Sequence, residues 1–184
     1  MGFIETEIPG LLIFEPKVFG DQRGYFLESY NKGVFEKQGI TTEFVQDNQS
    51  SSSYGVIRGL HYQLNPYAQA KLVRVLTGTI LDVVVDIRKG SPAYGKWVGI
   101  TLSAENKKQL YVPAGLAHGF SVLSDKAEIF YKCDSFYNKE SEGGILYNDP
   151  ALNIDWQIPS GKEILSDKDK VQPLLSDCKN NFIF

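Results

Sequence analysis

The stretch KLVRVLTGTILDVVVDIR, Lys71–Arg88, decides the fold of this chain. Apolar residues alternate along it on both sides of a Thr-Gly-Thr turn at residues 77–79, and Val, Ile and Leu dominate its composition. Period-two alternation interrupted by a glycine turn is typical of two β-strands joined as a hairpin. The stretch therefore predicts a β-hairpin near the middle of the chain.

The faces of these strands differ in chemistry, because successive side chains of a strand point to opposite sides. One face of residues 80–86 carries Leu81, Val83 and Val85, and the other carries Asp82, Val84 and Asp86. In FYKCDSFY the same alternation puts Tyr131, Cys133, Ser135 and Tyr137 on one face. Such mixed faces suit a barrel interior lined with polar groups, and they suit a solvated outer face equally well.

Outward from this stretch, the chain continues mainly as short strands. Further strands are predicted in YGVIRGLHYQ, KWVGITLS, QLYVPAG, AHGFSVLS and AEIFYKCDSFY. A helix is expected over 31–38, capped by Asn31 and ended by Gly39, and a short one near 166–170. We interpret the chain as mainly β, a single jelly-roll domain over 1–184 with a few short helices and an irregular segment from about 149.

Composition excludes several classes of protein. The 184 residues carry a net charge of −3 and 42% apolar residues, which disfavours general nucleic-acid or membrane binding. The two cysteines, Cys133 and Cys178, lack CxxC spacing and predict neither a disulfide framework nor a zinc site. The N-terminus, with acids and prolines, differs from a signal peptide, and apolar runs stay short of a membrane span. We expect a cytoplasmic protein.

The residues available for chemistry are few. The only histidines are His61, in RGLHYQ, and His118, after a Pro-Ala-Gly turn. Two histidines and a carboxylate can form a facial metal triad, but this ligand supply makes metal catalysis a minor alternative. The sequence has no phosphate loop opening a helix and no GxSxG elbow. Acid–base chemistry by His, Tyr, Lys and carboxylates remains, although each such residue alone has an ordinary structural interpretation.

Several blocks of sequence then agree with one another. They are FGDQRGYFLESYN, FVQDNQSSSSYGVIRGLHYQLNPYAQAKLVRVLTGTILDVVVDIRKGSPAYGKW, VPAGLAHGFSVLS, YKCDSFY and LSDKD. In this order and spacing, nearly end to end, the chain resembles the dTDP-4-dehydrorhamnose 3,5-epimerase family of dTDP-L-rhamnose biosynthesis. The resemblance implies a cupin-type jelly roll, usually a homodimer, that works without metal or cofactor on a dTDP-keto-sugar.

The resemblance also implies roles for individual residues. His61 would be the base, Asp169 the carboxylate that orients it, Tyr131 the proton donor on the far face, and Lys71 the support for the enolate oxygen. A substrate ketone at C4 acidifies the hydrogens on C3 and C5, so base and acid on opposite faces can invert both carbons. We further hypothesise, from the inward parity of Asp82, that Asp82 fixes Lys71 through a partly buried ion pair.

A second set would bind the substrate. It comprises Arg23, Glu28, Gln46, Asn48, Arg58, His118, Tyr137, Glu142 and Lys168, and Arg58 would clamp the diphosphate. Tyr137 resembles the aromatic that stacks on thymine, and Phe19 and Phe26 would add apolar walls. In the family the N-terminal segment crosses to the partner subunit, so Arg23 and Glu28 would serve the neighbouring site.

Three points stay open at the level of sequence. A single-carbon epimerase of a related nucleotide keto-sugar, or a non-catalytic sugar-nucleotide-binding jelly roll, remains an alternative. Arg58 and His61 are three residues apart and fall on opposite faces of a regular strand, so both can meet one ligand only if Gly59 marks a bulge or Arg58 reaches in from the rim. The segment SSSSYG, residues 50–55, is expected to be a flexible loop.

Overall fold

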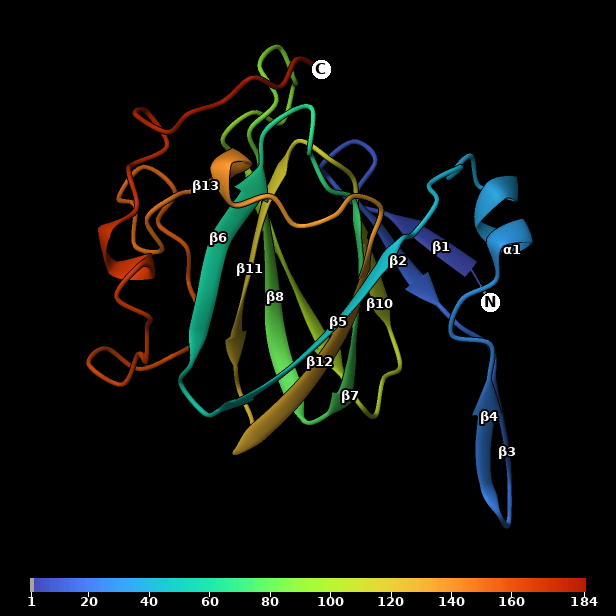
Figure 1. Cartoon of the computed structure of the whole chain (residues 1–184). Helices are drawn as coiled ribbons and strands as arrows, with labels where there is room; N and C mark the ends of the chain where they lie inside the picture. Colours follow the sequence, from blue (N-terminus) through green and yellow to red (C-terminus); the bar gives the residue numbers. More distant parts are fainter. Residues whose placement is uncertain (1) are drawn as a thin grey trace.

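The computed structural model describes residues 2–184, and two antiparallel sheets dominate it (Figure 1). The six-stranded sheet has the order β1 (Gly2–Glu5), β2 (Leu12–Glu15), β10 (Gln109–Val112), β7 (Lys71–Thr77), β12 (Lys126–Cys133), β5 (Gln46–Ser53). The five-stranded sheet has the order β13 (Glu142–Gly144), β6 (Ile57–Gln63), β11 (Leu116–Val122), β8 (Thr79–Asp86), β9 (Trp97–Ser103). The mainly β prediction is thus confirmed.

The segment that predicted a hairpin folds differently. Strands β7 and β8 follow each other in sequence but lie in different sheets, where β7 pairs with β10 and β12 and β8 pairs with β9 and β11. Gly78 makes the corner at a φ of +79°, and a Cβ there would lie 2.1 Å from the carbonyl oxygen of Lys126. The hairpin prediction was wrong because alternation identifies strands but not the sheet in which each strand finds its partner.

Both faces of β8 are buried, which resolves its mixed pattern. Ile80 and Val84 pack between the two sheets, whereas Leu81, Val83 and Val85 pack against the segment after β13. Asp82 is fully buried on the inner face. The interpretation as a polar-lined barrel interior is therefore confirmed for Asp82, and a solvated outer face is excluded.

The C-terminal segment forms an outer layer over the five-stranded sheet. Trp156 and Phe182 are buried against that sheet, and within the described residues beyond β13 the regular structure is one 3-10 helix, η2 (Asp169–Val171). The short helix expected near 166–170 is thus a single 3-10 turn. Within this layer, η2 carries Asp169 and contacts β6 of the barrel.

Several local predictions can be compared with the structure. Helix α1 (Lys32–Lys37) confirms the expected helix, and Gly39 follows it at a φ of +84°. Among the described residues the Asn31 side chain caps no backbone group, and it donates instead to Glu28. The expected flexible loop at 50–55 was wrong, because Ser50–Ser53 pair in register with β12 as the end of β5.

A hairpin near the N-terminus leaves the barrel. Strands β3 (Val18–Asp21) and β4 (Gly24–Leu27) pair only with each other in the described chain and project away from both sheets (Figure 1). Their aromatic side chains Phe19, Tyr25 and Phe26 are exposed. The sequence analysis missed this hairpin. Its apolar residues are exposed, so neither strand shows the alternation of buried apolar and exposed polar residues by which strands are recognised.

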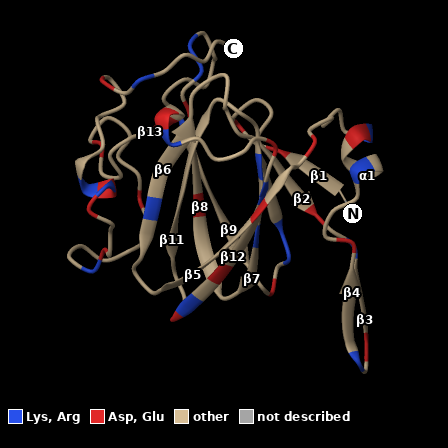
Figure 2. Ribbon diagram, viewed as in Figure 1, with Lys and Arg blue, Asp and Glu red and all other residues tan. Residues whose placement is uncertain are grey.

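Charges of both signs are spread over the molecule (Figure 2). Basic colouring on β6 and acidic colouring on β8 mark charge within the barrel wall, where Arg58 and Asp82 lie. Between residues 2 and 184, helices of the length and hydropathy needed to cross a membrane are absent.

Candidate active site

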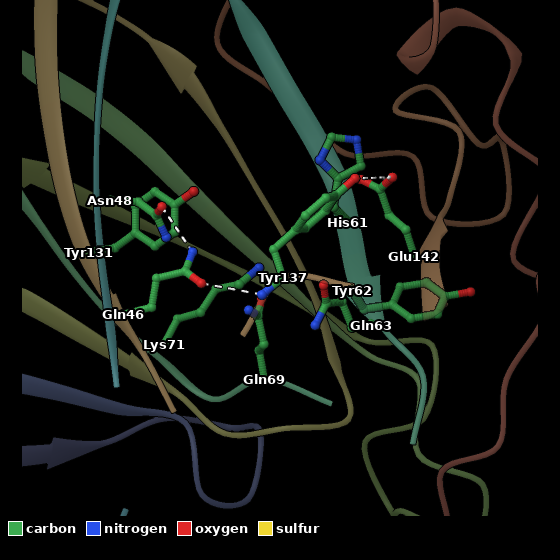
Figure 3. Close-up of a pocket in the computed structure, with 10 residues that line it drawn as sticks. All are labelled: Gln46, Asn48, His61, Tyr62, Gln63, Gln69, Lys71, Tyr131, Tyr137 and Glu142. Atoms are coloured by element: carbon green, nitrogen blue, oxygen red, sulfur yellow. Dashed lines mark hydrogen bonds between the residues drawn. The ribbon is translucent and has the colours of Figure 1, made fainter. Parts of the chain in front are cut away.

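Two adjoining cavities lie between the sheets, with volumes of about 410 and 460 Å³. Both are lined by His61, Lys71 and Tyr131. His61 comes from β6 of the five-stranded sheet, whereas Lys71 and Tyr131 come from β7 and β12 of the six-stranded sheet. The cavities therefore form one cleft whose middle is flanked by an imidazole on one wall and an ammonium and a phenol on the other (Figure 3).

An irregularity in β6 lets Arg58 and His61 face the same cleft. His61 pairs with His118 and Arg58 with Phe120, so three steps along β6 oppose two steps along β11. Gly59 sits in this interval at a φ of +127°, and a Cβ there would lie 2.5 Å from the Cα of Gly119. The extra residue reverses the alternation, and Arg58 and His61 both line the second cavity. Of the two alternatives left open by the sequence, a bulge at Gly59 or Arg58 reaching in from the rim, the structure shows the bulge.

His61 is bonded to a carboxylate far away in the sequence. Its Nε2 lies 2.6 Å from Oδ1 of Asp169, whose Oδ2 accepts from Ser166 Oγ at 2.9 Å. Burial tends to raise the pKa of Asp169, but hydrogen bonds from His61 and Ser166 and the positive charges of His61 and Lys168 lower it overall. Asp169 is therefore an ionised carboxylate bonded to the His61 imidazole.

The opposite wall carries two groups whose proton affinities are shifted by burial. Burial raises the pKa of Tyr131, the nearby Cys133 adds to this, and Arg58 opposes it. Burial lowers the pKa of Lys71, against the charges of Cys133, Asp82 and Glu142. Tyr131 therefore keeps its proton at neutral pH, and Lys71 loses its charge more readily than a lysine in water.

A second His–Asp pair lies beside the first. His118 Nε2 is 2.8 Å from Asp82 Oδ1, and both side chains are nearly enclosed. Within residues 2–184, Asp82 Oδ2 has no hydrogen-bond partner, and Lys71 is not among the ion-pair partners of Asp82. The hypothesis that Asp82 fixes Lys71 by a direct ion pair was wrong: its short contact is with His118, and it acts on Lys71 only through its charge.

The remaining polar residues fall into two groups along the cleft. Arg58 donates from Nε to Ser52 Oγ at 3.1 Å, which holds the guanidinium at the second cavity. Gln46 donates to Asn48 at 3.0 Å, and Asn48 contacts the Cys133 sulfur. These two amides line the first cavity (Figure 3).

Tyr137 and Glu142 close the first cavity on its other side. The Tyr137 hydroxyl donates to Glu142 Oε2 at 3.3 Å, and Lys168 forms an ion pair with Glu142. The alternation that placed Tyr137 on a face of β12 was wrong, because the strand ends at Cys133 and residues 134–138 leave the sheet. Tyr137 reaches the cavity nonetheless, carried by this irregular segment (Figure 3).

The structure does not bring every predicted residue to the cleft. In the described chain, neither cavity includes Arg23, Glu28, Phe19 or Phe26 in its lining. Arg23 forms an exposed ion pair with Asp21 at the tip of the β3–β4 hairpin, and Glu28 accepts from Asn31 just after it. These four residues lie on or beside the hairpin that projects from the barrel.

Sequence reasoning missed other residues of the cleft. Gln63, Gln69 and Tyr62 line the first cavity, and Ser166 supports Asp169. RGLHYQ contains Gln63 two positions after His61, so the period-two pattern was a signal that could have found it. Across residues 2–184, no group of three or more His, Cys, Asp or Glu side chains is arranged to hold a metal ion.

Comparisons with known proteins agree with this geometry. A family model described as dTDP-4-dehydrorhamnose 3,5-epimerase matches residues 5–177. A relative of that name from Shigella flexneri is 62% identical over 170 residues, which cover 92% of this chain and 93% of the relative.

Solved structures agree with the sequence relatives. The crystal structure of dTDP-4-dehydrorhamnose 3,5-epimerase from Elizabethkingia anophelis is 54% identical, with a TM-score of 0.94 over 98% of this chain and 99% of that one. A Legionella pneumophila 3,5-epimerase, crystallised in complex with dTDP-4-keto-L-rhamnose, is 51% identical, with a TM-score of 0.91 over 96% and 93% of the two chains.

Fold and cleft together define a cupin-type jelly roll with a cleft of ionisable side chains between its sheets. Relatives of this fold that the comparisons name are epimerases, which are isomerases. The chain belongs to the dTDP-4-dehydrorhamnose 3,5-epimerase family.

Proposed function

We propose that this protein converts dTDP-4-dehydro-6-deoxy-D-glucose into dTDP-4-dehydro-L-rhamnose by inverting C3 and C5, without a cofactor, in dTDP-L-rhamnose biosynthesis. The observation that carries the proposal is the bonded His61–Asp169 pair facing Tyr131 and Lys71 across one cleft, in a chain of this family. The alternatives from sequence, single-carbon epimerisation and binding without catalysis, remain outcomes of the test below.

Proton abstraction would be the work of His61. The C4 ketone of the substrate acidifies the hydrogens on C3 and C5, and imidazole takes up protons near neutral pH. Asp169, held as a carboxylate, would bond the ring and stabilise the imidazolium formed when the proton arrives. The exposed part of His61 opens to the cleft, so its free edge can reach a bound sugar.

Proton return would come from the other wall. Tyr131 stands on the opposite sheet and keeps its proton because burial raises its pKa. A proton removed on one face of the sugar and returned on the other inverts the carbon. Lys71, beside Tyr131, would supply positive charge to the enolate oxygen formed at C4, an interaction stronger in the transition state than in the ground state.

The remaining groups would bind the nucleotide. Arg58 would bind diphosphate oxygens in a bidentate manner, and Gln46, Asn48, His118, Glu142 and Lys168 would add polar contacts. Tyr137 would stack on thymine, since its ring is exposed at the first cavity.

We also propose that this single-domain chain works as a cytoplasmic homodimer, in which the β3–β4 hairpin carries Arg23 and Glu28 to the neighbouring cleft. Sedimentation velocity tests the dimer, and deletion of 18–27 should leave monomers.

Hydrogen exchange tests the reaction itself. In deuterated buffer, the protein with the dTDP-keto-sugar should incorporate deuterium at both C3 and C5, read by proton NMR. Label at a single carbon would replace the proposal by the single-carbon epimerase. Retained nucleotide binding with no label at either carbon would favour the non-catalytic binding protein.

A further inference from the structure

The segment that carries Tyr137 has no strand to hold it. After β12 ends at Cys133, residues 134–138 run without regular structure to the 3-10 helix η1 (Lys139–Ser141). Backbone polar groups outside secondary structure need other partners, and side chains can provide them. Here the partners are glutamine amides from three different strands or loops.

These amides bind successive residues of the segment. Gln69 donates to the Ser135 carbonyl at 2.7 Å, and Gln46 accepts from the Tyr137 amide at 3.2 Å. Gln63 donates to the Phe136 carbonyl at 3.2 Å and accepts from the Asn138 amide at 2.8 Å. Gln63 alone therefore holds the backbone on both sides of Tyr137.

Gln63 is built into the rigid part of the site. It is the last residue of β6, shares a face with His61 two positions earlier, and is only 5% exposed. Its Nε2 also donates to the Tyr67 carbonyl at 2.6 Å, so the amide uses donor and acceptor at once. Its strand position pairs with Glu142, the acceptor of the Tyr137 hydroxyl. Gln63 thus connects the strand of His61 to the backbone around Tyr137 and, through the paired Glu142, to the Tyr137 hydroxyl.

We propose that Gln63 is a positioning residue for nucleotide recognition, which fixes the Tyr137 ring at a set place relative to His61 before the ligand arrives. The inference rests on the proposed function, in which Tyr137 stacks on the base. An exposed aromatic ring held in its binding position loses less freedom on association, and affinity rises accordingly. A carboxylate or a thioether at position 63 cannot reproduce the pattern of two donations and one acceptance.

The first test is calorimetric titration with dTDP and with inorganic pyrophosphate. Gln63→Met keeps the side-chain volume and removes the three bonds. It should weaken dTDP binding roughly ten-fold, because the base loses its prepared stacking partner. Pyrophosphate lacks a base, so its affinity should stay within about two-fold of wild type. Equal weakening of both ligands would overturn the proposal.

A double-mutant cycle with Tyr137→Ala separates positioning from general destabilisation. If Gln63 acts through the tyrosine, Gln63→Met adds little to the loss already caused by Tyr137→Ala. Additive losses would overturn the proposal, as would an unchanged dTDP affinity of Tyr137→Ala itself. A non-additive cycle, combined with wild-type protein that shows no hydrogen exchange, would refute the proposed function and leave the positioning role intact.

A matched control is available in Asn180. Its amide likewise donates to a backbone carbonyl, that of Ile87, and accepts from the Phe182 amide at 2.9 Å. These bonds fix the C-terminal segment at a place outside the lining of the cleft. Asn180→Leu should lower thermal stability and leave dTDP affinity within about two-fold of wild type. A ten-fold loss of dTDP affinity in Asn180→Leu would show that losing any such pair of amide–backbone hydrogen bonds has this effect. That result would contradict the proposal.

Gln63→Glu keeps the test decisive if the methionine variant does not fold. At neutral pH the carboxylate accepts from Asn138 but faces the carbonyls of Tyr67 and Phe136, whereas a protonated carboxyl can donate to one of them. Burial raises the pKa of such a carboxyl, so protonation is reached in mildly acid solution. The dTDP affinity of Gln63→Glu, relative to wild type at each pH, should recover from about pH 8 to about pH 5. If the ratio of the two dTDP affinities did not change with pH, the proposed positioning by Gln63 would be contradicted.

Discussion

The two His–Asp pairs of the cleft have similar geometry and different surroundings. His61 and Asp169 are 2.6 Å apart, and His118 and Asp82 are 2.8 Å apart. The His61 side chain is 30% exposed to the cleft, compared with 10% for His118. Only an imidazole with access to the ligand can exchange a proton with it. This difference in exposure favours His61 over His118 as the proposed base.

The carboxylates also differ in how they are bonded. Both carboxylate oxygens of Asp169 are hydrogen-bonded, one to His61 and the other to the Ser166 hydroxyl, which donates to it. Between residues 2 and 184, one oxygen of Asp82 has no hydrogen-bond partner. An unpartnered buried oxygen leaves its negative charge to act on neighbours, and Lys71 is one of them. The first pair is suited to hold a base, and the second to hold a binding residue and a cation.

The largest effect is expected from removal of the first imidazole. His61→Asn should lower deuterium incorporation at C3 and C5 by about 10³-fold or more, in line with the loss of a general base. Nucleotide affinity should change little, because His61 is proposed to act on the sugar. NMR exchange rates and dTDP titration measure the two quantities. Turnover near the wild-type rate would refute the assignment of the base.

Loss of the first carboxylate should cost less. Asp169→Asn leaves the imidazole in place but removes the charge that orients it, and we expect a loss of roughly 10²-fold in exchange. If the residues act as a unit, the double variant with His61→Asn should be no slower than His61→Asn alone. A further loss in the double variant would mean that Asp169 has a role of its own.

The second imidazole provides the matched comparison. His118→Asn should raise KM for the dTDP-keto-sugar roughly ten-fold with a smaller effect on kcat, as expected of a binding group. Steady-state kinetics with NMR detection separates these constants. Loss of exchange at one carbon only would instead assign one proton transfer to each histidine.

Replacing Asp82 should have a smaller effect on kcat/KM, confined to alkaline solution. Burial lowers the pKa of Lys71, and the Asp82 charge is one of the interactions that oppose this. Asp82→Asn removes that opposition, so the Lys71 pKa should fall further and the ammonium be lost at lower pH. The alkaline limb of the kcat/KM profile should therefore move to lower pH. A limb that stays in place would remove Lys71 from the groups that control the rate.

The smallest effect concerns stability in acid. The pKa of Asp169 is lowered from its ordinary 3.8, so its ionised form stabilises the fold above that pH and loses the contribution as the pH falls through the folded value. Asp169→Asn should cost about 1–3 kcal/mol of unfolding free energy at pH 7. The gap to wild type should narrow as the pH falls below 3.8, measured by urea unfolding. A gap that widens in acid would contradict the ionised state.

Part of this site could be predicted from the sequence and its family resemblance. Gly59 offered an irregular strand as one of two ways to turn Arg58 and His61 to one side, because a glycine inside a strand often marks a bulge. The resemblance named Lys71 and Tyr131, and the structure places both at the cleft. The hairpin at Gly78 and the loop at Ser50–Ser53 were predicted wrongly, since pairing partners are chosen across the whole chain.

The sequence by itself determined the strand composition, the glycine at position 59 where a strand can become irregular, and the identity of the polar residues available for proton transfer. These follow from side-chain alternation and backbone freedom, which act over a few residues. Only the tertiary structure decided which carboxylate bonds which imidazole, for Asp169 and His61 are 108 residues apart. It also decided that Gln63 holds the segment around Tyr137, since a glutamine amide acquires a role only from the backbone groups that folding brings to it.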